Sequence, residues 1–518
     1  MATVERHRVR ARRVNRAERS VRGNWVVDVV LLGLAAALLR LPSFFASRHL
    51  LFDDGVYGAS AVAMRAGALP FREVFSSQGP LFLPLVYAFD ALGGRTLDAP
   101  RLLGLTSGVA VTLAVYATGR QVTTRGGALL AGGLVAASGS VLWTTGPLTS
   151  DGPGVALACA AVAVAVAYRR TPSTRLAVVV GVLAGAAFAV KSLLVVPALV
   201  AVGLLLLGRR RFGDVGLAVG IAVAVLVAVT VPWGVHNVID QSVGYHTDQA
   251  THQAPSANFT KTLRTLGDRD APLLGVAVLA AAAAAVASIG TATSRRRASE
   301  PAQLGRSQAH NTGERPNSAA FATWWERATS PRVAIAVWLV LALLVLVLES
   351  PMWRNHVAHL VPPAALLVGI YRPPWWTLVL AALVLVPYHV VHIDGLLAPA
   401  PYRGDDARLV RALEALPAGA QAISDDPGFV WRSGHATPPG FVDTSVLRIE
   451  STRPSLRITG ERVARAASRD PVCAVVIWSS RFGRFSDLPA RLQRAGYRQA
   501  ATYAHDRSLW RRPCRIRR

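Results

Sequence analysis

Long apolar blocks alternate with short polar connections along most of the chain. The blocks run for about 16–22 residues, which is long enough for an α-helix to cross the hydrocarbon core of a bilayer. GLAVGIAVAVLVAVTV and VAIAVWLVLALLVLVL are two examples. A membrane β-barrel would instead show shorter segments in which apolar and polar residues alternate. The pattern therefore predicts an all-α polytopic membrane protein.

The apolar blocks predict about eleven transmembrane helices within residues 25–393, and their connections follow the positive-inside rule. With the basic tail, residues 1–24, in the cytoplasm, every connection on the predicted cytoplasmic side carries arginine. The same alternation places the loop 42–99 and the C-terminal segment 394–518 outside. The predicted spans lie near residues 25–41, 100–119, 127–145, 152–168, 176–190, 192–207, 214–235, 271–290, 332–348, 356–371 and 374–393.

The block GPLFLPLVYAFDAL, residues 79–92, is apolar but short, and it contains two prolines. As a span it would place RQVTTRG outside and reverse every later connection. We therefore favour a re-entrant or interfacial segment of the external loop, which is tolerated where protein or water covers the backbone. The apolar pattern alone does not decide between a span and a re-entrant segment.

Two polar regions differ from the helical blocks. Residues 291–331 are polar and aperiodic, which predicts a flexible cytoplasmic loop. The segment 394–518 predicts a compact α/β domain outside the cytoplasm. Its expected elements are strands near 420–426, 473–480 and 497–504 and a short helix over 487–496.

The chain has three cysteines. Cys159 lies in a predicted span, where it is most simply a small packing residue. Cys473 and Cys514 lie in the C-terminal domain, and an oxidising compartment would allow them to form a disulfide. The sequence does not decide whether they do.

Arginine dominates the formal net charge of +26. The excess sits in short runs between apolar blocks, which is a topology signal rather than a nucleic-acid-binding surface. We therefore exclude nucleic acid as a partner and expect anionic membrane lipids instead. The basic N-terminal run leads into a full-length apolar segment, which indicates a signal anchor. We expect a multi-pass protein of the cell (plasma) membrane.

Polar side chains gather at the predicted external ends of the spans. Acidic residues near a bilayer are costly and mark functional sites. Cations at a headgroup boundary bind lipid phosphate by charge-assisted hydrogen bonds, and a nearby carboxylate can be the general base for an attacking hydroxyl. The mixture indicates group transfer from a lipid-phosphate donor. Its members are Asp53, Asp54, Arg72, Glu73, Asp151, Lys191, His236, Glu349, Arg354, His356 and His359.

The external loop FDDGVYGASAVAMRAGALPFREVFSSQGPLFLPL resembles the first external loop of GT-C glycosyltransferases, in the branch with protein O-mannosyltransferases and lipid A aminoarabinose transferases. That loop opens with an acidic pair and a tyrosine and closes with a Pro-rich re-entry. WRNHVAHLVPPAALLVG, residues 353–369, also resembles a late span that begins with a basic residue and Leu-Pro-Pro. The matching positions in the loop are Asp53-Asp54-Gly55-Val56-Tyr57, Gly67 and Gly79-Pro80-Leu81.

The resemblance implies that Asp53 and Asp54 are catalytic. Asp53 would deprotonate the acceptor hydroxyl for an in-line attack on the anomeric carbon, so that polyprenyl phosphate leaves and the configuration inverts. Lys191, Arg354 and His356 are expected to bind the leaving phosphate. The full set of expected substrate-binding residues is Tyr57, Arg72, Gln78, Asp151, Lys191, Arg354 and His356.

This sequence departs from the family pattern at two positions. The second acid is Asp54, where Glu is commoner, and Gln78 stands where relatives often carry a basic residue. The donor sugar is therefore not implied. The implied partners are a polyprenyl-phosphate sugar donor, membrane lipids and an extracytoplasmic acceptor, which is a cell-wall polysaccharide, a glycolipid or a protein.

No cofactor or metal site is predicted. His236, His246 and His252 match no compact ligand spacing, so a solvated surface explains them better. Some GT-C enzymes use a divalent metal, and that alternative stays open.

Simpler roles compete for several of these residues. Either aspartate of the pair can cap a helix over 55–66 that ends at Gly67. Lys191 can snorkel to the interface, and Asp151 suits a turn ahead of the next span. The segment ATPPGFVDTS, residues 436–445, is either a strand-end turn or a lining of the acceptor path.

A different class of protein also fits the numerous spans, namely a transporter or flippase of a lipid-linked sugar. Charges within spans mark transport paths too, and transporters favour internal repeats. The sequence shows neither a convincing repeat nor charges deep in the spans. The external loop with its acid pair and the outer soluble domain favour an enzyme.

Overall fold

A computed structural model describes residues 25–207, 212–248, 253–303, 330–448 and 457–516. The predicted tail 1–24 lies outside the described residues. Of the predicted loop 291–331, residues 291–303 are not flexible coil but continue helix α14 (Pro255–Gln303), and residues 304–329 lie outside the described part.

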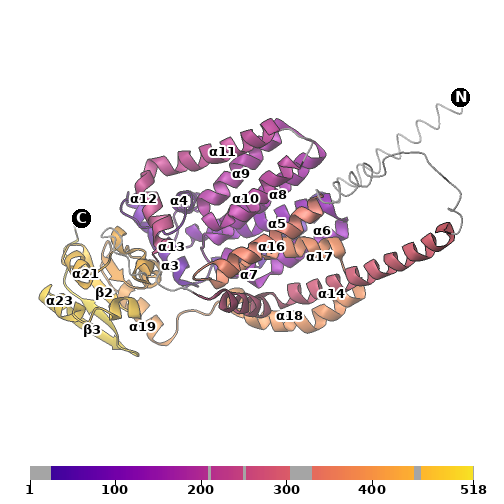
Figure 1. Ribbon diagram of the computed structural model, residues 1–518. Coiled ribbons are helices and arrows are strands. Elements are labelled where there is room, and N and C mark those ends of the chain that lie inside the picture. Colours follow the sequence, from indigo (N-terminus) through magenta and orange to yellow (C-terminus); the bar gives the residue numbers. More distant parts are fainter. Residues whose placement is uncertain (1–24, 208–211, 249–252, 304–329, 449–456, 517–518) are drawn as a thin grey trace, which may run out of the picture.

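A bundle of apolar helices forms the body of the protein (Figure 1). Most predicted spans overlap one helix, but 127–145 is divided between α6 and α7, and 271–290 is only part of the longer α14. The first helix is Trp25–Leu38. It is followed by α2 (Leu41–Phe44), α3 (Phe52–Arg65), α4 (Phe82–Leu92), η1 (Ala99–Arg101), α5 (Leu102–Val122), α6 (Arg125–Ala137), α7 (Gly139–Thr145), α8 (Asp151–Arg170), α9 (Thr174–Val190), η2 (Ser192–Leu194), α10 (Val195–Leu206), α11 (Phe212–Thr230), η3 (Val231–Trp233), α12 (Val235–Ile239), η4 (Asp240–Gly244), α13 (Tyr245–Thr247), α14, α16 (Pro331–Leu348), η5 (Arg354–His359), α17 (Val361–Tyr371) and α18 (Trp375–Leu397).

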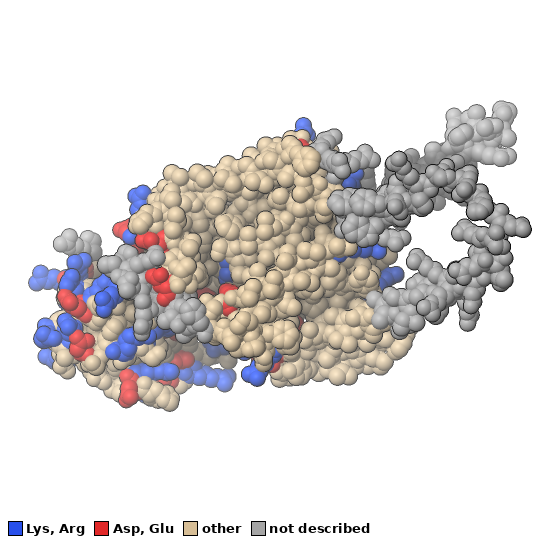
Figure 2. Space-filling model, viewed as in Figure 1, with Lys and Arg blue, Asp and Glu red and all other residues tan. Residues whose placement is uncertain are grey.

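Five helices in the described part of the chain are long and apolar enough to cross a membrane, or six if α6 and α7, which meet at an angle of 56°, form one span. Figure 2 shows the same property on the surface, because a broad uncharged belt covers the body and the charged residues gather at its ends. These features indicate a multi-pass membrane protein, as the sequence predicts. The count of about eleven spans stays a prediction.

Close contacts between small residues hold neighbouring helices of the body together. A Cβ atom on Gly127 of α6 would lie 2.2 Å from the Gly369 carbonyl oxygen of α17, and one on Gly369 would lie 2.4 Å from that of Gly127. Such contacts let backbones approach in a medium where water does not drive helices together. Larger side chains at these positions would push α6 and α17 apart.

Connections that the positive-inside rule places on one side meet at one end of the bundle. The Thr123 hydroxyl donates to the Gly369 carbonyl at 2.8 Å, which joins the α5–α6 turn to the end of α17. Arg125 Nε donates to Asp28 Oδ2 of the first helix at 2.9 Å. The residues of the external loop 42–99 meet the Lys191 turn at the opposite end. The alternation of connections is therefore consistent with the contacts.

Helix α4 occupies the block 79–92 that the sequence left open. At 1.5 Å per residue a helix of this length covers about half of a 30 Å hydrocarbon core. The chain before it packs on the end of α9, where the backbone N–H groups of Gly79 and Leu81 donate to the carbonyls of Val190 and Ala189 at 3.1 and 3.0 Å. Helix α4 is too short to be a span, so the re-entrant or interfacial interpretation fits the structure.

The C-terminal region contains a four-stranded sheet in the order β1-β2-β4-β3. Strands β1 (Gln421–Ser424) and β2 (Val472–Ile477) are parallel, and β4 (Arg507–Arg511) pairs antiparallel with β2 and with β3 (Arg498–Tyr503). The three predicted strands are confirmed, as is the predicted helix, α23 (Leu488–Arg494). The remaining elements are α19 (Gly404–Glu414), α20 (Pro427–Arg432), η6 (Pro439–Phe441), η7 (Thr444–Arg448), α21 (Gly460–Ala467) and α22 (Ser480–Gly483).

The sequence analysis missed strand β4, because a tight turn without a glycine precedes it. His505 and Asp506 both have positive φ, at 61° and 57°, as hairpin turns require. Cys473 of β2 and Cys514 are joined as a disulfide. The question that the sequence left open is thus answered in favour of a bond.

The C-terminal domain sits at one end of the bundle and contacts it through α20 and α3 (Figure 1). The contact depends on glycines. A Cβ atom on Gly58 of α3 would lie 2.3 Å from the Trp431 ring, and one on Gly55 would lie 2.5 Å from Gly428 Cα. The helix that carries the acid pair is therefore packed directly against the soluble domain.

Candidate active site

A cavity of about 1000 Å³ opens between the bundle and the C-terminal domain. Its wall comes from the start of α3, the chain before α4, the start of α8, the turn after α9, the segment after α11 and the chain after α16. Seven of the predicted site residues line it: Asp53, Tyr57, Gln78, Asp151, Lys191, Arg354 and His356. Asp54 and Arg72 are not among its lining residues.

Helix α3 separates the two aspartates of the acid pair. Successive residues on a helix point about 100° apart, so the two neighbours face different surroundings. Asp53 is half-buried and lines the cavity, whereas Asp54 is fully buried. Neither caps the helix, since α3 begins one turn earlier than predicted and its N-cap is Leu51. Gly67 does follow the helix end with a positive φ of 92°.

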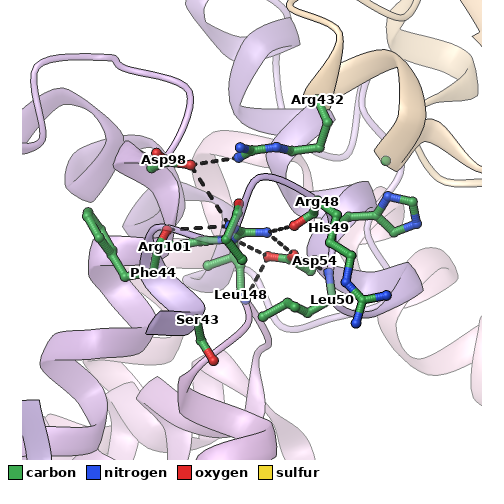
Figure 3. A network of polar contacts seen from close by, with 12 residues as sticks. Ser43, Phe44, Arg48, His49, Leu50, Asp54, Asp98, Arg101, Leu148 and Arg432 are labelled. Atoms are coloured by element: carbon green, nitrogen blue, oxygen red, sulfur yellow. Dashed lines mark hydrogen bonds and ion pairs between the residues drawn. The ribbon is translucent and has the colours of Figure 1, made fainter. Parts of the chain in front are cut away.

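Asp54 is held in a closed network of polar contacts (Figure 3). Arg101 donates to both of its oxygens, at 3.1 Å from Nε and 2.6 Å from one terminal nitrogen. The backbone N–H groups of Leu50 and Leu148 donate to it at 2.9 and 3.0 Å. Burial raises the pKa of Asp54, but the Arg101 charge and these hydrogen bonds outweigh it and hold the pKa below its usual value. The ionised Asp54 carboxylate therefore binds Arg101 and the backbone of Leu50 and Leu148 to the start of α3.

The same network reaches the C-terminal domain. Arg101 donates to the carbonyls of Ala46 and Arg48 at 2.7 and 2.5 Å. Asp98 lies 3.9 Å from the Arg101 guanidinium and 2.7 Å from that of Arg432 on α20 (Figure 3). The chain ahead of α3, the start of α5 and the soluble domain are therefore tied together around Asp54.

A series of charged and histidine side chains, here called the charge chain, lies along the cavity. Lys191 Nζ lies 2.8 Å from Asp151 Oδ1 and 2.9 Å from His356 Nε2. His356 Nδ1 lies 2.7 Å from the Glu349 carboxylate, and His359 Nε2 lies 3.0 Å from Asp151 Oδ1. Residues from the ends of four different helical segments thus meet at one place.

The position of Lys191 follows from a break in the backbone. Lys191 has extended dihedrals, φ −154° and ψ 120°, between α9 and η2, so its side chain leaves the helix axis and enters the cavity. It does not simply snorkel along apolar surface, because its ammonium has two polar partners. Asp151 is the first residue of α8, and its carboxylate pairs with Lys191 and His359.

The charge chain leaves cations close to a half-buried acid. Burial raises the pKa of Glu349, but the charges of His356 and Lys191 outweigh it, so the pKa lies below its usual value and the carboxylate stays ionised. The Lys191 ammonium can exchange a carboxylate partner for a phosphate oxygen, since both are anionic acceptors. The arrangement suits a phosphate that enters and leaves.

Tyr57 and Gln78 shape the wall between Asp53 and the charge chain. The Tyr57 ring packs edge to face on Phe82, with the ring centroids 4.6 Å apart. Burial and the Asp53 charge raise the pKa of Tyr57 well above its usual value, so the hydroxyl stays protonated. Gln78 Oε1 accepts a hydrogen bond from the Ser150 hydroxyl at 2.7 Å. Gln78 therefore places a neutral amide on this wall.

The two predicted arginines lie further out. Arg354 lines the cavity, is about half exposed and lies 2.5 Å from the Asp268 carboxylate. Arg72 is exposed and donates to the Pro232 carbonyl at 3.2 Å. The structure therefore brings Arg354 to the rim of the cavity and leaves Arg72 outside it.

Several lining residues were not identified as candidates from the sequence. Lys261 lines the cavity and donates to the Met352 carbonyl at 2.5 Å. His246 was assigned to a solvated loop, but it lines the cavity and lies 3.1 Å from the Ser77 carbonyl. Burial and the nearby Lys191 charge lower the pKa of His246. The solvated-surface interpretation holds for the exposed His236 but misses the place of His246 in the cavity wall, and His252 lies outside the described residues.

The C-terminal domain also contributes to the cavity. Asp443 and Ser445 line it, and both belong to the segment ATPPGFVDTS, for which the sequence allowed a role along the acceptor path. Within the residues that the structure describes, no three His, Cys, Asp or Glu side chains are arranged to hold a metal ion.

Comparison with known proteins gives a consistent result. Residues 77–234 match the family of dolichyl-phosphate-mannose-protein mannosyltransferases. The crystal structure of ArnT from Cupriavidus metallidurans bound to undecaprenyl phosphate is similar, with a TM-score of 0.58 at 14% identity over 94% of this chain and 98% of that chain. The apo state of the same protein gives a TM-score of 0.57 at 14% identity over 95% and 98%. No curated protein matches the sequence.

The oligosaccharyltransferase of Archaeoglobus fulgidus in its apo form is less similar, with a TM-score of 0.49 at 12% identity over 91% of this chain and 73% of that chain. The family match and the likeness to ArnT confirm the resemblance to GT-C glycosyltransferases that the acid-pair loop predicts. This chain has their fold, with the helical bundle and the C-terminal domain together covered by the likeness.

Proposed function

We propose that the protein is an integral membrane glycosyltransferase. It transfers a sugar from a polyprenyl-phosphate donor to an acceptor outside the cytoplasm, and the acceptor is a cell-wall polysaccharide, a glycolipid or a protein. One observation carries the proposal: a single cavity has the carboxylate of Asp53 on one wall and, on another, the Lys191 ammonium with the His356 imidazole beside it. A base and a phosphate site in the same cavity are what such a transfer requires.

The reaction follows from these positions. The Asp53 carboxylate takes the proton of the acceptor hydroxyl, and the hydroxyl oxygen attacks the anomeric carbon. The bond between that carbon and the phosphate oxygen breaks, and its electron pair leaves with polyprenyl phosphate, which Lys191 and His356 stabilise. A single displacement of this kind inverts the anomeric configuration. Asp54 supports the reaction by holding the start of α3 in place.

The proposed topology supplies both substrates to this cavity. The arginine-rich connections face the cytoplasm of a cell (plasma) membrane, with about eleven spans in residues 25–393 and the domain 394–518 outside. The polyprenyl chain then reaches the cavity from the bilayer, and the acceptor reaches it from the outer face. The apolar residues Leu226, Val227 and Val231 line the cavity beside the polar site and suit a lipid chain.

The proposal is tested by sugar transfer in membranes that contain the protein. The donors are radiolabelled undecaprenyl-phosphate mannose, glucose, galactose and arabinose, and the variants are wild type and Asp53→Asn. We expect one donor to label an acceptor with inverted configuration in wild type and not in Asp53→Asn. If wild type uses none of the donors, or Asp53→Asn transfers equally well, the proposal fails and transport of a lipid-linked sugar becomes the better interpretation.

A further inference from the structure

We propose that Arg269 of α14 is a positioning residue for the phosphate end of the cavity. Arg269 is not among the described residues that line the cavity, but its guanidinium binds Asn355, which does line it. Asn355 lies between Arg354 and His356 in the chain. The inference rests on the proposed glycosyl transfer and deepens it, because it names a residue outside the cavity that holds the phosphate-binding segment in place.

The kink in α14 brings this helix against two other segments. Asp270 has φ −135° and ψ 30°, so the regular helix is interrupted there. The Asp270 carboxylate accepts from the Ser138 hydroxyl at 2.5 Å and from the Ser140 backbone N–H at 3.4 Å, at the start of α7. Two residues earlier, Asp268 Oδ2 lies 2.5 Å from the Arg354 guanidinium at the start of η5. The kink therefore ties α14 to both α7 and η5.

Arg269 lies between these two contacts in the chain and joins both segments by itself. Its guanidinium carbon is 5.1 Å from the centroid of the Trp143 ring of α7, and one terminal nitrogen donates to Asn355 Oδ1 of η5 at 3.3 Å. Its backbone carbonyl also packs against α7, since a Cβ atom on Gly139 would lie 2.2 Å from that oxygen. A planar guanidinium can stack on an aromatic ring and donate in its own plane at the same time, which a lysine ammonium cannot do.

The segment that Arg269 holds has little stability of its own. Helix η5 is a 3₁₀-helix of six residues without a side-chain N-cap, and the hydrogen bonds of such helices have poorer geometry than those of α-helices. His356 of η5 lies 2.9 Å from Lys191 Nζ and 2.7 Å from the Glu349 carboxylate. Adjacent Cα atoms are about 3.8 Å apart, so a shift of Asn355 moves His356 as well. A misplacement of about 1 Å in a site can cost about 10²-fold in rate.

The neighbouring ion pair between Asp268 and Arg354 holds the segment less firmly. Both of its side chains are partly exposed, and ion pairs in contact with solvent contribute little because water and salt screen them. Arg269 is half-buried and stacks on Trp143, so its hydrogen bond to Asn355 is better shielded. We therefore assign the positioning role to Arg269.

The test measures binding of bare undecaprenyl phosphate to the purified full-length protein. We expect Arg269→Gln and Arg269→Lys each to weaken binding about tenfold, because neither side chain can stack on Trp143 and bind Asn355 together. The melting temperature should change little. Arg264→Gln is the matched control, because it removes the same charge from an exposed position of α14, and it should bind the lipid as wild type does.

A double-variant cycle tests whether Arg269 acts through Asn355. Asn355→Ala should weaken binding of the bare lipid by itself. The double variant Arg269→Gln with Asn355→Ala should then bind no more weakly than the weaker of the two single variants, since both substitutions remove the same support. Additive losses would show that Arg269 does not act through Asn355 and would overturn the inference.

The other contrary results are equally specific. Wild-type binding by Arg269→Gln would mean that η5 needs no support from α14, and wild-type binding by Arg269→Lys alone would mean that charge matters and position does not. Weaker binding together with a clearly lower melting temperature would mean that Arg269 supports the fold as a whole. Failure of wild type itself to bind the lipid would contradict the proposed phosphate site and the inference together, whereas the other results leave the proposed function standing.

Discussion

The two aspartates that open the external loop are neighbours in the sequence and opposites in the structure. Asp53 faces a cavity large enough for a substrate, whereas Asp54 has no exposed surface and is bound by Arg101 and two backbone N–H groups. The chemical type of a residue is thus a poor guide to its role here. What decides the role is whether the carboxylate is enclosed in the protein or lines the cavity.

The same contrast applies to the regions around the two residues. The cavity joins charged and histidine side chains from several helices, and the Lys191 ammonium among them can bind a phosphate. The network around Asp54 joins the external loop, the start of α5 and the soluble domain, and Asp54 and Arg101 at its centre are fully buried. One region performs the proposed chemistry, and the other keeps the first region assembled. Substitutions should therefore separate activity from stability.

The largest effects are expected when the two aspartates are exchanged for asparagine. Asp53→Asn removes the proposed base, and general base catalysis typically contributes about 10²–10⁴-fold to a rate. We expect kcat to fall by this amount, with little change in the melting temperature of the purified protein. Asp54→Asn removes the charge that Arg101 needs, so the melting temperature should fall clearly. Transfer assays and thermal unfolding in the same detergent measure both.

The contrast would be lost if both variants melted like wild type, or if Asp53→Asn lost activity only because it unfolded. Glu73→Gln is the matched control. Glu73 is an exposed acid of the same loop, and its carboxylate accepts a hydrogen bond from the Leu69 backbone N–H. Glu73→Gln should leave kcat and the melting temperature nearly unchanged.

Removing Arg101 from its ion pair with Asp54 should lower the stability nearly as much as removing the Asp54 charge. Arg101→Leu leaves the Asp54 carboxylate buried without its cation, and removal of one partner from a buried ion pair costs about 3–5 kcal/mol. The double variant Asp54→Leu with Arg101→Leu removes both charges, so it should recover part of this loss. Chemical unfolding of wild type, Asp54→Leu, Arg101→Leu and the double variant gives the coupling free energy between the two side chains. Additive effects of the two substitutions would contradict the assignment.

The sequence predicts the helices well because the bilayer imposes long apolar blocks, and their ends place Lys191 and Asp151 on one side. It also identifies Asp53 through the loop pattern. It does not separate Asp53 from Asp54, because the partner that neutralises Asp54 is 47 residues away. For a similar reason the sequence left open whether the segment with Asp443 and Ser445 lines the cavity, since only the docking of the C-terminal domain brings it there.

A smaller effect is expected from overpacking the contact between α3 and α20. Gly58→Ala places a methyl group where the Trp431 ring lies, at 2.3 Å from its nearest atom. Overpacking of this kind costs about 1–3 kcal/mol, because either α3 or α20 has to move. We expect a lower melting temperature and a lower kcat, since Asp53 and Asp443 belong to the two sides of this contact.

Gly133→Ala provides the matched control for this substitution. Gly133 lies in α6, and a Cβ atom there meets nothing within 4 Å. This variant should keep the stability and the activity of wild type. If Gly58→Ala behaved like Gly133→Ala, the close packing of α20 on α3 would be wrong.

The smallest predicted effect depends on pH and concerns the pair formed by His49 and Asp426, whose side chains lie 3.4 Å apart between the external loop and α20. Burial lowers the pKa of His49, but the Asp426 charge outweighs it, and Asp54 adds to the effect while Arg101 opposes it. The net pKa lies above its usual value of 6.5. A raised pKa in the folded state means that the pair stabilises the protein fully below about pH 6.5. The contribution is lost as the pH rises through the raised value.

Asp426→Asn removes the charge and keeps a side chain that can cap α20, as Asp426 does through the Gly428 N–H. We expect this variant to be less stable than wild type by about 1 kcal/mol at pH 6, and by less at pH 9, where His49 is neutral in both proteins. Thermal unfolding from pH 6 to pH 9 measures the difference. A difference that is constant over this range, or that grows toward pH 9, would show that the charge of His49 does not help to hold the soluble domain against the acid-pair helix.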